Sequence, residues 1–81
     1  MRIKIKLFAI LRDRAGVSEL ELELPSNATA ASAGATLITR LPALQSAMGS
    51  VAYAVNREYA PATTVLNDGD ELALIPPVSG G

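Results

Sequence analysis

Two short segments of this sequence alternate between apolar and charged residues without a break. In residues 2–7 isoleucines and a leucine alternate with an arginine and two lysines, and in residues 19–24 three leucines alternate with three glutamates. Successive side chains of a strand point to opposite faces, so each segment predicts a strand with one buried and one solvated face. In an antiparallel hairpin the basic and acidic residues would face each other, contributing about 0.2–1 kcal/mol per pair. The chain must therefore build a sheet with one charged, solvated face.

Between these two strands, Arg12, Asp13, Arg14 and Gly16 indicate a polar connection. After the second strand, Thr29 is a candidate N-cap, and apolar residues recur at helical spacing over residues 29–41. Pro42 ends or bends this predicted helix and can begin a short further turn over residues 42–48. Because Gly34 costs a helix about 1 kcal/mol relative to alanine, we expect the helix to depend on packing against the sheet.

The second half of the chain predicts three more strands. Residues 51–55 form the first, residues 58–60 add a short edge segment, and residues 66–70 make a turn rich in residues that accept positive φ. In the last strand, residues 71–75, Leu72 and Leu74 face the core. Ala73 and Ile75 then lie on the other face as an apolar strip, for which docking and incidental exposure are both open explanations.

One mixed sheet packed on one main helix is the economical arrangement for this order of elements. This is the α+β class and the β-grasp, or ubiquitin-like, architecture. A parallel pairing of the first and last strands is implied by the resemblance to that fold.

Composition excludes several kinds of chemistry. The 81 residues include no cysteine and no histidine, and the carboxylates show no metal-ligand spacing, so we expect no disulfide, thiolate, imidazole or metal site. A net charge of −1 argues against nucleic-acid binding. No segment is long and apolar enough for a signal peptide or a membrane span, and we expect a cytoplasmic protein.

The sequence ends in Pro76-Pro77-Val78-Ser79-Gly80-Gly81. The prolines should stop the last strand and direct the final residues away from the domain. Four residues beyond Pro77 span roughly 13 Å, and glycines without a Cβ fit a narrow channel. The alternative is an ordinary frayed chain end.

Three stretches together resemble one family: residues 7–12, residues 54–59, and residues 66–81 with Asp68-Gly69-Asp70-Glu71 and the Pro-Pro-Val-Ser-Gly-Gly end. Over essentially its whole length the chain resembles the small subunit of molybdopterin synthase, the MoaD family. It departs from the family at the start of the helix, where Thr29-Ala30-Ala31-Ser32-Ala33-Gly34 lacks the usual acidic capping partner and three larger apolar residues. We therefore expect a weakly packed helix.

The resemblance implies a β-grasp domain over residues 1–77 and an extended, flexible tail over residues 78–81. An E1-like activating enzyme would use ATP to adenylate the carboxylate of Gly81, and a sulfur donor system would convert it to a thiocarboxylate. The tail would then enter the large synthase subunit and donate sulfur to the molybdopterin dithiolene in molybdenum cofactor biosynthesis. The chain would bind no cofactor and supply no catalytic side chain, so the resemblance implies a sulfur-donating subunit of an enzyme complex.

The same resemblance assigns partner contacts to Pro76, Pro77, Val78, Ser79 and Gly80 in the tail. Phe8, Ala73 and Ile75 are candidate interface residues, with a core position as the alternative for Phe8. Three other functions remain open: a sulfur carrier for another pathway, a ubiquitin-like modifier joined to lysines through Gly81, and a non-covalent β-grasp interaction module.

Overall fold

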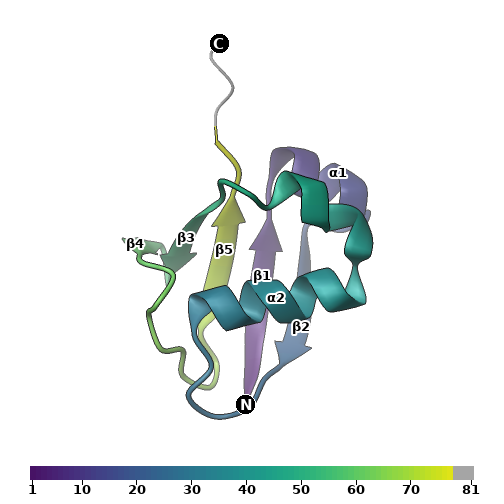
Figure 1. The fold of residues 1–81 in the computed structure, drawn as a ribbon. Coiled ribbons are helices and arrows are strands. Elements are labelled where there is room, and N and C mark those ends of the chain that lie inside the picture. The colour runs from purple at the N-terminus through teal and green to yellow at the C-terminus, as the bar shows by residue number, and fades with distance from the viewer. Residues whose placement is uncertain (78–81) are drawn as a thin grey trace.

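The computed structural model describes residues 1–77, which form a single sheet with helices against one face (Figure 1). In chain order the elements are β1 Arg2–Leu7, α1 Ala9–Ala15, β2 Glu19–Glu23, α2 Ala30–Arg40, the 3₁₀ helix η1 Pro42–Ala47, β3 Ala52–Val55, β4 Glu58–Ala60 and β5 Glu71–Ile75. The predicted tail positions Val78, Ser79, Gly80 and Gly81 lie outside the described residues.

The sheet order is β2-β1-β5-β3-β4. β1 pairs with β2 in antiparallel fashion and with β5 in parallel fashion, and β3 joins β5 and β4 by antiparallel pairs. The predicted hairpin and the predicted parallel pairing of the first and last strands are both confirmed. The architecture is the expected β-grasp, a mixed sheet packed on one main helix.

The alternation suggests that each basic residue of β1 pairs with the glutamate directly opposite it on β2. The observed ion pairs differ from this. The ion pairs join Arg2 to Glu23 at 3.0 Å, Lys4 to Glu19 at 3.9 Å and Lys6 to Glu71 at 3.5 Å. Only the first joins residues directly opposite in the β1–β2 register, because the longer lysine side chains reach diagonally or across to β5. The hydrogen bond to Glu23 raises the pKa of the Arg2 guanidinium.

The core lies between the sheet and α2. It is built from the inward residues of the two alternating segments, from β5 and from the helix, with Ile3, Ile5, Leu7, Leu22, Leu37, Leu72 and Leu74 all at most 2% exposed. The predicted inward positions of Leu72 and Leu74 are confirmed. Burying these side chains contributes about 1.5–3 kcal/mol each, so apolar burial holds the helix to the sheet.

The cap of α2 does not need the missing acidic residue. The Thr29 hydroxyl accepts a hydrogen bond from the Ser32 backbone N–H at 3.1 Å, and the Ser32 hydroxyl accepts one from the Thr29 N–H at 2.8 Å. A serine thus completes the reciprocal capping box that glutamate or glutamine usually forms. The helix begins where the sequence predicts it.

The connection after β1 is polar and exposed at Arg12, Asp13 and Arg14, as predicted, but it forms a helix that no sequence pattern indicated. α1 is seven residues long, ends at Gly16 with φ 79°, and buries Leu11 completely. A helix this short with one buried residue carries little periodicity in its sequence, while Arg12, Asp13 and Arg14 face solvent. Leu11 joins the core and holds α1 across the end of the sheet.

Gly34 marks a close approach of α2 to β3. A Cβ at this position would lie 3.2 Å from the Tyr53 hydroxyl oxygen and 3.3 Å from the Met48 Cε atom. The helix penalty that the sequence indicates is therefore offset by packing that a larger residue would disturb.

We predict that Thr29→Ala lowers the free energy of unfolding by about 1 kcal/mol, because the Ser32 N–H loses its acceptor. Urea unfolding followed by circular dichroism measures this. Thr63→Ala is the control, since Thr63 is exposed and its hydroxyl makes no hydrogen bond within residues 1–77. Equal unfolding free energies for the two variants would contradict the capping role.

We also predict that Gly34→Val destabilises the protein by about 1–3 kcal/mol through overpacking against Tyr53 and Met48. Ala31→Val in the exposed face of the same helix should cost less than 1 kcal/mol, a difference set by helix propensity of about 0.7 kcal/mol or less. If thermal unfolding finds the two variants equally stable, the close approach does not restrict this position.

Candidate functional site

The open face of the sheet, opposite α2, carries the exposed apolar residues that the sequence singled out. The alternation of β1 continues one residue beyond the strand, because Phe8 is extended with φ −129° and ψ 156°. Phe8 therefore shares a face with Lys6 and is 42% exposed, which rules out the alternative of a core position. Since β1 and β5 are parallel, Phe8 and Ile75 lie at the same end of the sheet.

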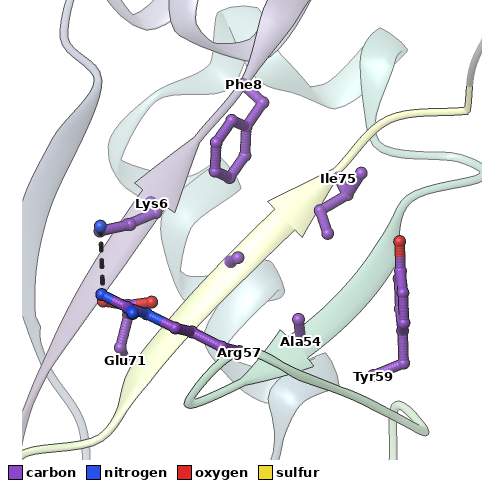
Figure 2. Close-up of a pocket in the computed structure, with 8 residues that line it drawn as sticks. Lys6, Phe8, Ala54, Arg57, Tyr59, Glu71 and Ile75 are labelled. Carbon is purple, nitrogen blue, oxygen red and sulfur yellow. Dashed lines mark ion pairs between the residues drawn. The ribbon is translucent and has the colours of Figure 1, made fainter.

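A shallow hollow of about 380 Å³ lies between these residues (Figure 2). Ala54 on β3 and Ala73 on β5 are paired directly across the strands and are 6% and 7% exposed, so they form its floor. Larger side chains stand around this pair, and the lining residues are Lys6, Phe8, Ala54, Arg57, Tyr59, Glu71, Ala73 and Ile75. We call this site the open-face hollow.

The structure thus brings the three predicted interface residues together but gives them different positions. Phe8 and the half-buried Ile75 offer apolar surface, whereas Ala73 is nearly covered and supplies only the floor. Sequence reasoning missed Ala54 and Tyr59, the latter 77% exposed. Ala54 belongs to the site because the strand register places it opposite Ala73. No sequence pattern gives that register.

The charged rim of the hollow is held in place by the turn between β3 and β4. Asn56 and Arg57 both have positive φ, 51° and 72°. The Asn56 side chain donates to Asp70 Oδ1 at 3.0 Å and accepts from the Glu71 N–H at 3.0 Å, which fastens the turn to the start of β5. Arg57 makes no ion pair within residues 1–77, while Lys6 and Glu71 pair with each other. A partner would therefore meet a positive charge beside an apolar hollow.

The base of the predicted tail lies at the same end of the molecule. β5 ends at Ile75, so the prediction that Pro76 and Pro77 stop the last strand is confirmed. Both prolines line a second surface hollow of about 370 Å³ with residues of α1 and of the segment around η1, including Ile10 and Arg14. Arg14 donates a hydrogen bond to the Ser46 hydroxyl and so ties α1 to η1 beside the prolines.

None of the polar or charged side chains in residues 1–77 is buried. That part of the chain also contains no group of three or more histidine, cysteine, aspartate or glutamate residues arranged to hold a metal ion. No helix among the described residues has the length and apolar character needed to cross a bilayer.

Known proteins with similar sequences match along the whole chain. The chain is 43% identical to the molybdopterin synthase sulfur carrier subunit of Chlamydomonas reinhardtii, with all of both chains covered. It is 38% identical to the corresponding subunit of Arabidopsis thaliana, covering all of this chain and 84% of that relative. The resemblance to the MoaD family is confirmed.

Among solved structures, the small archaeal modifier protein SAMP1 from Haloferax volcanii is similar with a TM-score of 0.91 and 34% identity, each chain being fully covered. The family whose pattern matches is the ThiS family, over residues 5–81. This match spans nearly the entire sequence, including the segment after β5, and the chain therefore belongs to the ThiS family.

Proposed function

We propose that this protein is the sulfur carrier subunit of a molybdopterin synthase and that the Gly81 carboxylate carries the sulfur. The observation that supports this most directly is the match, at 43% identity and full coverage of both chains, to a relative bearing that name. The placement of the open-face hollow beside the base of the tail fits a protein that docks by its domain and delivers its tail. The proposal places the protein in the cytoplasm.

The chemistry proposed for Gly81 requires a leaving group, because a carboxylate oxygen is not displaced directly. The carboxylate attacks the α-phosphorus of ATP, pyrophosphate leaves, and an acyl adenylate forms on an E1-like activating enzyme. Sulfide-level sulfur supplied by a donor then attacks the acyl carbon and AMP leaves, so a C–S bond replaces the C–O bond to AMP and a thiocarboxylate results. In the large synthase subunit the thiocarboxylate sulfur attacks a carbon of the precursor, and an oxygen group on that carbon leaves. Water then cleaves the acyl–sulfur bond, which returns the Gly81 carboxylate and leaves the sulfur on the precursor. The chain itself binds no cofactor; ATP belongs to the activating enzyme.

The open-face hollow is the surface that we propose for docking to the large subunit. Phe8 and Ile75 would bury apolar area, and Arg57 would meet an acidic group of the partner. Ala73 and Ala54 keep the floor low enough to receive a partner side chain. Val78, Ser79 and Gly80 would then extend roughly 13 Å with Gly81 into the partner, at about 3.3 Å per residue.

A second function, protein modification through Gly81, is favoured by one observation. The similarity to SAMP1, a protein whose name describes it as a modifier, covers the whole chain, as does that to the sulfur carriers, although the identity of 34% is lower. Both functions begin with adenylation of the same carboxylate and differ in the nucleophile that attacks next. Finding Gly81 in isopeptide linkage to lysines of other proteins would favour modification.

We predict that deleting Gly81, or adding a residue after it, abolishes sulfur loading and leaves the domain folded, since β5 already ends at Ile75. Intact-mass spectrometry after incubation with the activating enzyme, ATP and a sulfur donor would show the wild-type chain heavier by the difference between sulfur and oxygen. Circular dichroism checks the fold of each variant. Wild-type protein that never loads with its cognate partners present would refute the carrier function.

We predict that Phe8→Ala weakens binding to the large subunit about 5-fold or more, the effect of losing roughly 1 kcal/mol at an interface. Val65→Ala serves as the matched control, because Val65 is 51% exposed and does not line the hollow. Isothermal titration calorimetry measures both. Equal affinities would show that the open-face hollow is not the docking surface.

A further inference from the structure

The strand β2 forms one edge of the sheet and lies on the side away from β4 (Figure 1). Its pairing with β1 reveals which backbone groups are already used. Leu24 donates to the Met1 carbonyl at 2.8 Å, the Met1 amino group donates to the Leu24 carbonyl at 2.7 Å, and Leu7 donates to the Ser18 carbonyl at 2.8 Å. Hydrogen-bonded pairs alternate along an antiparallel ladder, so the even-numbered residues of β2 bond to β1.

The odd-numbered residues Glu19, Glu21 and Glu23 therefore direct their backbone N–H and carbonyl groups away from β1, where the sheet has no further strand within residues 1–77. Such a row of free groups is a template for another strand. A strand added here would bond to the backbones of the three glutamates, and its residues opposite them would share the open face with their carboxylates.

The other face of this edge meets a groove of about 280 Å³ between β2 and α2. Its lining is mostly apolar and consists of Ala15, Val17, Leu20, Leu37 and Leu41 together with Glu21 and Arg40. Val17 is 44% exposed and Leu20 is half-buried, so an apolar side chain in the groove would cover both. Small β-branched side chains suit an added strand at this position.

The charges on β2 select what can pair with it. Glu21 makes no ion pair within residues 1–77, and Glu19 reaches Lys4 only at 3.9 Å, whereas Glu23 already pairs with Arg2 at 3.0 Å. Glu21 and Glu19 are therefore the main partners for an added basic residue. A second copy of this chain paired antiparallel through β2 would place glutamate opposite glutamate, which is destabilising. Basic residues opposite the glutamates would be attracted instead. Antiparallel pairing of β2 with the β2 of a second copy is therefore disfavoured, whereas pairing with a cationic strand is favoured.

We propose that β2 binds an extended segment of a partner protein in which basic residues alternate with β-branched apolar residues. The basic side chains lie against Glu19, Glu21 and Glu23 on the open face, and the apolar ones enter the groove beside Val17 and Leu20. Backbone hydrogen bonds of this kind supply affinity, while alternate side chains supply specificity. The open-face hollow is centred on β5 and β3 and reaches β1 at Lys6, next to Glu19. The two surfaces therefore adjoin each other, but the hollow and the groove share no lining residue.

The test uses the full ¹⁵N-labelled chain titrated with the blocked peptide Lys-Val-Lys-Val-Lys-Val and with its matched counterpart Glu-Val-Glu-Val-Glu-Val. The lysine peptide should shift the amide signals of β2 and Val17, and the glutamate peptide should not. Glu21→Lys should weaken binding of the lysine peptide about 2- to 30-fold, the combined effect of losing an attraction and gaining a repulsion, and should permit binding of the glutamate peptide. Glu58→Lys on β4, at the opposite edge, should leave both affinities unchanged.

Four results would overturn the proposal. They are the absence of any shift at millimolar lysine peptide, shifts confined to the open-face hollow, equal binding of the two peptides, and concentration-dependent shifts on β2 without peptide, which would indicate a second copy. The spectrum of each variant shows whether it is folded before the titration begins.

Discussion

The parallel pairing of β1 with β5 is the constraint on which the rest of the structure depends. These are the first and last strands of the described residues, and the turn before β5 is bonded to the start of β1. The Gly69 N–H donates to the Arg2 carbonyl at 2.8 Å, the Arg2 N–H donates to Asp68 Oδ1 at 2.8 Å, and the Lys4 N–H donates to the Asp70 carbonyl at 2.9 Å. These bonds set the register, so the inward residues of both strands meet α2 together. The same pairing brings the ends of both strands, and hence Phe8 and Pro76, to one end of the sheet.

The open face has a charged half on β1 and β2 and a hollowed half on β5 and β3. The difference arises from the side chains that each pair of strands directs to this face. β1 and β2 carry charges of opposite sign, whereas β5 and β3 place two alanines side by side in the middle of the face. Small residues there leave a hollow, and the larger Phe8, Ile75 and Tyr59 bound it. This division suits the function that we propose. In that proposal the reacting atom belongs to Gly81, so the domain has two tasks. It supplies a surface that binds the partner, and β5 ends beside that surface.

Most of the fold could be predicted from the sequence, and the errors have physical causes. Strict alternation identified β1 and β2, and the capping residue Thr29 located α2. α1 was missed because its single buried residue, Leu11, leaves almost no periodic signal among charged neighbours. The expectation of a weakly packed helix came partly from the missing acidic capping residue, but the Ser32 hydroxyl accepts the same hydrogen bond from the Thr29 N–H. In the candidate site, alternation along the last strand predicted Ala73 and Ile75, and the family resemblance predicted Phe8, but the depth of the hollow was not predicted.

By itself, the sequence determined the elements whose side chains repeat with the period of their backbone, the charged open face, and the Gly-Gly sequence on which the proposed function rests. Only the tertiary structure decided which residues meet across strands. Register is a long-range property, so nothing local shows that Ala54 lies opposite Ala73, that Gly34 faces Tyr53 and Met48, or that the backbones of the β2 glutamates face outward. Contacts between segments distant in sequence depend on the register of the strands. The register is set by burial of all the core residues together, so no single segment determines it.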